Sequence, residues 1–163
     1  MSERSITIRP LGEIPQATRV LAEWFHDQWH DYDGRSVAAI EAQLAENFGL
    51  GAVPITFVAE SGSDLIGTVS IDLSDLPEFD YLSPWLASLY VVPSSRRAGI
   101  GTALVQKALA FAHAHRISVL YLWTPRSTRL YKNCGWTVFD STTYNSQAIT
   151  LMRFNQWEKF TNR

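Results

Sequence analysis

The chain has 163 residues and a mass of 18.4 kDa, which suits one compact domain and is short for two. Apolar residues make up 46% of the chain and charged residues 18%, a composition that excludes intrinsic disorder. The formal net charge of −2 gives no basic footprint for nucleic acid, and no apolar run reaches the ~20 residues that span a bilayer. We therefore expect a cytoplasmic single-domain protein that binds neither nucleic acid nor membrane.

The first third of the chain predicts one strand followed by two helices. Residues 6–10 alternate between apolar and polar side chains and stop at a proline, which is typical of a short strand. Apolar residues then recur at helical spacing from Pro15 onward, until Asp33-Gly34 ends that helix. Ser36 can cap a second helix, which ends at Gly49.

The remaining two thirds alternate between strands and helices. Two β-rich runs, residues 55–60 and 65–71, flank a glycine-containing turn and predict a hairpin. The further elements expected in chain order are a strand at 85–92, a helix at 99–112, a strand at 117–123, a short helix at 127–133 and strands at 136–139 and 148–153. The sequence thus predicts one mixed α/β domain with about seven strands and about four helices.

The segment from residue 89 to residue 104 joins a strand to a helix and is the most informative part of the chain. Gly99 and Gly101 allow a tight turn with no Cβ in the way of a ligand. The helix that follows presents unpaired N–H groups, and Arg96 and Arg97 add positive charge. These features favour a pyrophosphate, although the glycine pair alone is equally typical of an ordinary strand–helix turn. A Walker A loop is excluded because no Gly-Lys-Ser/Thr sequence is present.

The spacing Arg96-x-x-Gly99-x-Gly101, after a strand, resembles the acyl-CoA-binding signature of the GNAT superfamily of N-acyltransferases. A second segment, Leu130–Trp136, is similar to the Leu-Tyr-Glu-Lys-x-Gly-Phe segment of that family. One helix and one strand separate the two motifs, as they do in the family. The resemblance covers about residues 5–153, which leaves residues 154–163 as a C-terminal tail of a single domain, 1–163.

The resemblance implies a central, mostly antiparallel sheet with one splayed pair of strands. It also implies acetyl-CoA as co-substrate, with its pyrophosphate held by the backbone of the turn and its pantetheine arm lying along the preceding strand. The residues expected to bind it are Leu89, Tyr90, Val91, Arg96, Arg97, Ala98, Gly99, Ile100, Gly101 and Thr102. An amide left unpaired on that strand could polarise the thioester carbonyl.

The implied reaction is direct attack of a primary amine on the thioester. Tyr131 matches the family tyrosine that points at the sulfur of CoA. A phenol of pKa ~10 stays protonated at neutral pH and can donate to a leaving thiolate, so Tyr131 is the expected general acid. The alternative is a core tyrosine that only anchors the short helix.

The general base is less clear from the sequence. Many relatives have a carboxylate on the strand before the CoA-binding turn, whereas residues 85–88 contain no Asp or Glu. Glu78 and Asp80, and Asp72 at the end of the previous strand, are the nearby carboxylates, although each is more often a solvated loop charge. We list Glu78 and Asp80 as base candidates, and Ser88 as a residue that can position a water.

Two other groups of residues invite functional interpretations that we do not favour. His26 and His30 have the i,i+4 spacing of helical metal ligands, but no third ligand is evident, so we expect no metal. Cys134 lies close to Tyr131, but no histidine is placed to activate it, and a small buried hydrophobic side chain is the simpler interpretation.

The resemblance also implies that the acceptor amine binds between the first two helices and the loop of residues 74–84, because these regions flank the substrate cleft of the family. An aromatic-rich stretch in the first helix could line this pocket and attract an ammonium group, namely Trp24, His26, Trp29, His30 and Tyr32. A small-molecule amine is the favoured acceptor, with a peptide or protein amine as a variant. The competing hypothesis is a CoA-binding sensor or scaffold with little catalysis. A homodimer is common in this family.

Overall fold

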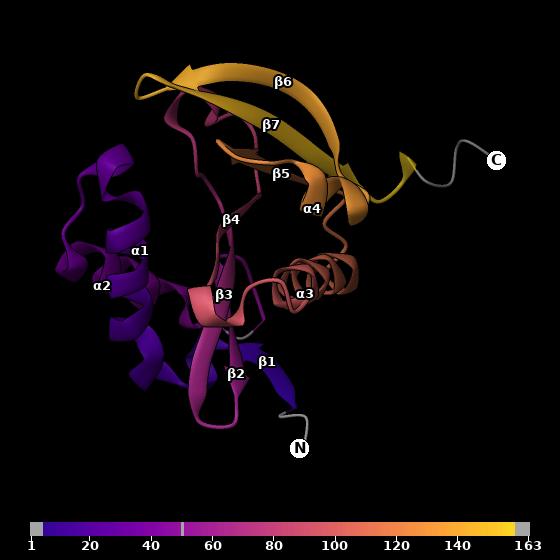
Figure 1. Cartoon of the computed structure of the whole chain (residues 1–163). Coiled ribbons are helices and arrows are strands. Elements are labelled where there is room, and N and C mark those ends of the chain that lie inside the picture. Colours follow the sequence, from indigo (N-terminus) through magenta and orange to yellow (C-terminus); the bar gives the residue numbers. More distant parts are fainter. Residues whose placement is uncertain (1–4, 50, 159–163) are drawn as a thin grey trace.

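The computed structural model describes residues 5–49 and 51–158, without the side chains of residues 32 and 33. Its centre is a seven-stranded sheet in the order β1-β2-β3-β4-β5-β7-β6 (Figure 1). The strands are β1 (Ile6–Pro10), β2 (Ile55–Ser61), β3 (Asp64–Asp72), β4 (Trp85–Val91), β5 (Val119–Thr124), β6 (Thr137–Tyr144) and β7 (Gln147–Asn155). Every neighbouring pair is antiparallel except β4 and β5, which run parallel.

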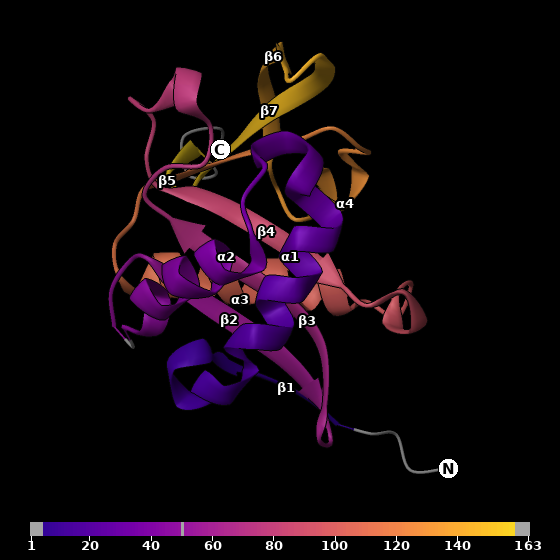
Figure 2. The same ribbon diagram turned by 90° about the vertical axis from the view of Figure 1, so that its left-hand side faces the viewer.

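Helices cover both faces of the sheet, as the two perpendicular views show (Figures 1 and 2). The helices are α1 (Thr18–Asp33), α2 (Val37–Ala45), α3 (Ile100–Ala114) and α4 (Arg129–Asn133). The predicted cap of α2 is confirmed, because the Ser36 hydroxyl accepts the N–H of Ala39 at 3.1 Å. None of these described helices combines the length and the apolar character that a membrane crossing requires.

Side chains alternate between the two faces of the sheet along the central strands, so a separate hydrophobic core forms on each face. Phe57 and Val69 point to one face, where they are buried under α3 against residues such as Leu104. Val58 points to the opposite face and is buried under α1 and α2, together with residues such as Leu21. The site therefore lies on a sheet that is fixed from both sides.

The sheet opens between β4 and β5. Among the described residues their only register pair is Trp85 with Tyr121, and the Tyr121 N–H donates to the Pro84 carbonyl at 3.1 Å. Beyond this point the two strands diverge, which confirms the predicted splayed pair. On its other edge β4 has a bulge, because the register with β3 shifts so that Ser88 and Leu89 lie opposite Val69.

The C-terminal hairpin is longer than the sequence indicated. The sequence predicted that the first strand of this hairpin ends at residue 139, whereas β6 continues to Tyr144. The second strand, β7, extends to Asn155, inside the predicted C-terminal tail. Residues 140–143 are polar because β6 is an edge strand that faces solvent, and they gave no apolar alternation to detect. The two-residue turn at Asn145 and Ser146 has φ values of 44° and 65°, which suit a tight hairpin.

Close packing of α3 on β3 gives a stability prediction. A Cβ added at Gly67 would lie 2.9 Å from the Tyr90 carbonyl oxygen and 3.0 Å from Leu104 Cδ1. We expect Gly67→Ala to lower the free energy of unfolding by about 1–3 kcal/mol through overpacking, measured by urea denaturation. Gly51→Ala is the matched control, because a Cβ there meets nothing within 4 Å. Equal stabilities of the two variants would contradict this packing argument.

Candidate functional site

A cavity of about 590 Å³ lies where β4 and β5 diverge. Its walls come from β4, β5, the turn before α3, the start of α3, α4 and the C-terminal half of α1. The predicted residues that line it are Ser88, Leu89, Tyr90, Val91, Arg96, Arg97, Gly99, Ile100, Gly101, Thr102 and Tyr131. This volume falls within the range typical of small-molecule and cofactor sites.

The N-terminus of α3 is built to bind an anion. Gly99 caps the helix at φ 79°, a left-handed conformation that other residues rarely adopt, and its carbonyl accepts the first helical bond, from Ala103, at 3.0 Å. Residues 100–102 come before Ala103, the first donor of the helix, so their N–H groups have no partner within the helix. They lie at the positive end of the helix dipole and line the cavity, and the diphosphate that the sequence led us to expect there stays a prediction.

Gly101 allows a close contact between two helices. A Cβ there would come within 3.1 Å of Leu130 Cδ1 on α4, so the missing side chain lets α4 pack close to the start of α3. Because Tyr131 follows Leu130, this contact also fixes Tyr131 beside the anion-binding turn.

Arg96 connects the turn before α3 to β4 by a hydrogen bond. Its Nε donates to the Val91 carbonyl at 2.8 Å, and its guanidinium lies 5.6 Å from the centre of the Tyr90 ring. The Tyr90 ring in turn packs on Trp24 of α1 at 5.3 Å. Arg97 is exposed at the cavity wall, with a φ of 64°, whereas Ala98 is exposed and does not line the cavity.

The backbone of β4 presents polar groups to the cavity. Val92 donates its N–H to the Ile66 carbonyl of β3 at 2.9 Å. Since backbone groups alternate in direction along a strand, the N–H groups of Val91 and Leu89 point the other way, toward the gap between β4 and β5. The bulge begins at Ser88, whose φ of 57° reorients the strand at this point. An extended ligand arm can pair with these groups.

Tyr131 lies half-buried in the cavity wall. Its ring packs edge-on against Trp136, with centroids 6.3 Å apart and an interplanar angle of 69°. Burial raises the pKa of the Tyr131 phenol to about 12; the nearby Arg126 guanidinium acts to lower the pKa and Cys134 to raise it. The hydroxyl is therefore protonated at any pH near neutrality.

The predicted base candidates lie elsewhere. Glu78 belongs to the short turn Pro77–Phe79 and Asp80 follows it; both are exposed and neither lines the cavity. Their place in the fold does not favour a role as base. Ser88 does line the cavity, as does Asp75, which lies in the predicted acceptor loop of residues 74–84 but was not a predicted base.

The aromatic stretch of α1 that was predicted to bind the acceptor lines the cavity only in part. Trp29 lines it together with Phe25, whereas Trp24 packs against Tyr90 instead. His26 and His30 do not line it, and their rings stack on each other at 5.1 Å. The Tyr32 side chain lies outside the described part of the structure.

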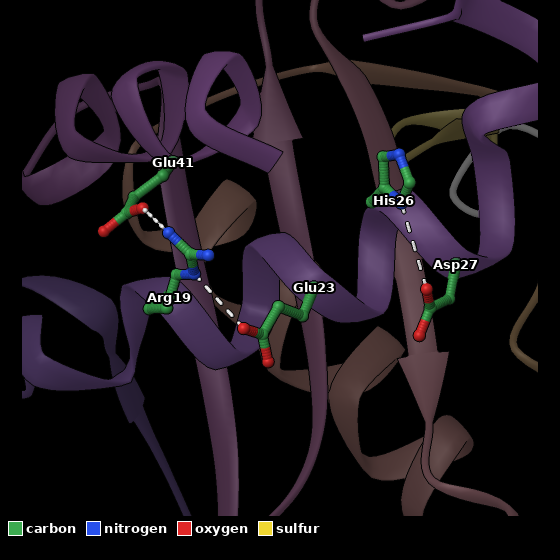
Figure 3. A network of polar contacts seen from close by, with 5 residues as sticks. All are labelled: Arg19, Glu23, His26, Asp27 and Glu41. Atoms are coloured by element: carbon green, nitrogen blue, oxygen red, sulfur yellow. Dashed lines mark hydrogen bonds and ion pairs between the residues drawn. The ribbon is translucent and has the colours of Figure 1, made fainter. Parts of the chain in front are cut away.

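His26 belongs to an exposed polar surface of α1 (Figure 3). There Arg19 pairs with Glu23 at 3.1 Å and with Glu41 at 3.3 Å, and so ties α1 to α2. Exposed pairs of this kind contribute little to stability. The described residues contain no group of three or more His, Cys, Asp or Glu side chains arranged to hold a metal.

Further cavity residues come from segments without a sequence motif. They are Gln28, Arg35, Trp123, Thr124, Pro125, Arg126, Ser127 and Tyr144. Tyr144 sits at the tip of the β6–β7 hairpin, far in sequence from α1, and Trp123 donates its indole N–H to the Asp75 carbonyl at 3.1 Å. Only the tertiary fold brings these segments together.

Comparison with known proteins decides the family. Residues 15–136 match the family described as the Acetyltransferase (GNAT) family, which is most of the chain. The chain belongs to this GNAT family. It is therefore an acetyltransferase, a transferase that uses acetyl-CoA, and the two sequence motifs identified it correctly. No curated protein sequence shows significant similarity to the chain.

Solved GNAT structures share the fold at low sequence identity. The yncA protein of Salmonella typhimurium, solved with its cofactor acetyl-CoA, has a TM-score of 0.72 and 16% identity, covering 92% of this chain and 93% of its own. The spermidine/spermine N-acetyltransferase SpeG of Vibrio cholerae has a TM-score of 0.66 and 18% identity, covering 96% and 98%. Ard1 of Thermoplasma volcanium has a TM-score of 0.70 and 15% identity, covering 92% and 97%. At such identities, the similarity establishes the fold of this GNAT protein and leaves its acceptor open.

Proposed function

We propose that this GNAT protein transfers the acetyl group of acetyl-CoA to the primary amine of a small molecule. The observation that supports the proposal best is that one continuous cavity is lined both by the turn before α3 and by the aromatic residues Phe25 and Trp29 of α1. The yncA structure contains acetyl-CoA, and it supports the proposal that this chain, with the same fold, has a helix N-terminus suited to a diphosphate beside a strand whose backbone groups can pair with a ligand.

In this proposal the chain binds acetyl-CoA through three features. The N–H groups of residues 100–102 hold the diphosphate, and the Arg97 guanidinium adds positive charge beside it. The pantetheine arm pairs with the backbone of Val91 and Leu89 along β4. The Leu89 N–H, at the bulge, then lies near the thioester carbonyl and stabilises the oxyanion that forms on attack.

The reaction proceeds by direct attack. The neutral amine attacks the thioester carbon, a tetrahedral intermediate forms, and its collapse breaks the C–S bond. Tyr131 donates its phenolic hydrogen to the leaving sulfur and acts as general acid. Cys134 is half-buried and does not line the cavity, so its place in the fold offers no route to a covalent intermediate.

A small acceptor is favoured over a peptide because side chains from separate elements surround its end of the cavity. Phe25 and Trp29 of α1 form one wall and Tyr144 of the β6–β7 hairpin forms another. The aromatic faces attract an ammonium group, and the Asp75 carboxylate lines the same cavity.

Release of free CoA thiol from acetyl-CoA tests the proposal, with panels of small amines, amino sugars and peptides as acceptors. We expect turnover with at least one small primary amine and a slower rate with peptides that carry the same amine. Faster turnover with peptides would assign the protein to peptide acetylation. Calorimetric binding of CoA without turnover of any acceptor would instead favour a CoA-binding sensor.

A further inference from the structure

A second, smaller cavity of about 50 Å³ adjoins the first. The two share four lining residues, namely Phe25, Arg35, Asp75 and Ser88. The small cavity has room for a few water molecules and is lined by polar groups that can hold them. It lies on the α1–α2 side of β3 and reaches Asp72, the last residue of that strand.

Asp72 sits in a buried polar network. Its Oδ1 accepts a hydrogen bond from Asn47 Nδ2 at 3.2 Å, and Asn47 Nδ2 also donates to Thr56 Oγ1 at 3.1 Å. The Thr56 and Ser70 hydroxyls bond each other at 2.7 Å. This network is satisfied by any oxygen at position 72, so an amide would serve the fold as well as a carboxylate does. A carboxylate there needs another explanation.

We propose that Asp72 is the proton acceptor of the acetyl transfer, and that the ammonium of the bound amine reaches it through Ser88 and water in the small cavity. This inference rests on the proposed function. Ser88 lies three residues from Trp85, which pairs with Asp72, so about 10 Å of strand separates the two positions. That span is too long for direct transfer and suits a relay through water.

The protons balance along this route. The acceptor ammonium loses one N–H proton through Ser88 and water to the Asp72 carboxylate, which later releases it to solvent. The freed lone pair forms the C–N bond as the C–S bond breaks. A second N–H proton of the tetrahedral intermediate replaces the one that Tyr131 gives to the leaving sulfur. The products are the amide and the thiol of CoA.

The charges around Asp72 agree with this role. Burial raises its pKa to about 6, the Asn47 hydrogen bond and the Arg35 guanidinium hold it from rising further, and the group is mostly ionised at pH 7. Besides Asp72, the charged residues that line the small cavity in the described structure are Arg35, bonded through Nη1 to Gln43 Oε1, and Asp75. A base with a pKa just below neutrality is well placed to accept and release protons.

The test compares two acceptors of the same shape with wild-type protein and Asp72→Asn. One is an alkyl amine that is protonated at neutral pH, and the other is its fluorinated analogue, already deprotonated there. For the alkyl amine we expect Asp72→Asn to lower kcat about 100-fold or more at pH 7, and to replace the fall in rate that wild type shows below about pH 6 with a rate that keeps rising with pH toward the pKa of the amine. For the fluorinated amine we expect Asp72→Asn to lower kcat by less than about threefold, because this amine is already neutral and needs no base before it attacks.

Asp64→Asn, at the exposed opposite end of β3, is the matched control and should leave both rates unchanged. Ser88→Gly removes the hydroxymethyl group at a position whose φ of 57° suits glycine, and should slow acetylation of the alkyl amine selectively. It provides the test if Asp72→Asn does not fold.

Equal losses for the two amines, or an acid limb whose midpoint stays near pH 6 in Asp72→Asn, would overturn the role of Asp72 while leaving the proposed function intact. A wild-type protein that acetylates neither these amines nor any other acceptor would overturn the proposed function, and this inference with it.

Discussion

Tyr131→Phe is expected to lower kcat for acetyl transfer at least tenfold, which corresponds to about 1.4 kcal/mol of transition-state stabilisation. The substitution removes only the hydroxyl, because the edge-on packing of the ring against Trp136 is available to phenylalanine as well. Gly101 and Leu130 still hold α4 against α3. The lost rate therefore reports on the hydrogen that the phenol donates to the leaving sulfur.

The pH dependence of this donor follows from its burial. Because the pKa of Tyr131 is raised to about 12, the phenol stays protonated far above neutrality. A leaving thiolate has a pKa near 8.5 and is a weaker base than the phenolate, so complete transfer is uphill and the gain comes mainly from the hydrogen bond to the developing charge. We therefore expect no alkaline fall in kcat from Tyr131 below about pH 11.

The measurement is thiol release at saturating substrates, with single-turnover kinetics to show that chemistry limits the rate. Tyr121→Phe is the control, since Tyr121 packs on Trp85 and Phe139 and does not line the cavity. An unchanged single-turnover rate in Tyr131→Phe would remove Tyr131 from the mechanism and leave it as an anchor of α4.

The part of the cavity that we assign to acetyl-CoA was predictable from the sequence because it is local, and its role in binding stays a prediction. One continuous segment contains strand β4, the turn and the start of α3, so the motif Arg96-x-x-Gly99-x-Gly101 encodes its geometry directly. The position of Tyr131 followed from a second local motif. What the motifs did not predict is that Arg96 bonds the Val91 carbonyl, since that contact depends on the shape of the folded turn.

The acceptor half was predictable only in outline, as the first two helices and the loop of residues 74–84, because three distant segments build it. Phe25 and Arg35 come from the α1–α2 region, Asp75 from the loop after β3, and Tyr144 from the tip of a hairpin. None of these segments has a spacing that indicates a ligand. The sequence favoured Glu78 and Asp80 as bases because they are carboxylates near β4. The base that we propose instead, Asp72, differs from them by its burial and by its hydrogen bond to Asn47, which lies 25 residues away.

Asp72→Asn is expected to raise the free energy of unfolding by up to about 3 kcal/mol at pH 8 and to leave it unchanged at pH 4. The pKa of Asp72 is about 6 in the folded chain, above its ordinary value of 3.8, so the folded state binds the proton more tightly than the unfolded state. The wild type is therefore most stable below that ordinary value and loses stability as the pH rises through about 6. A shift of about two units corresponds to about 3 kcal/mol.

Urea denaturation of both proteins at the two pH values measures this difference, with Asp64→Asn as the control for a change of net charge. Asparagine keeps an oxygen for the Asn47 amide but has no charge to desolvate. Lower stability of Asp72→Asn at pH 8 would show that the ionised carboxylate stabilises the fold, and position 72 would then need no catalytic explanation. Higher stability combined with lower activity would mean that the chain retains a destabilising charge where the acetyl transfer requires a base.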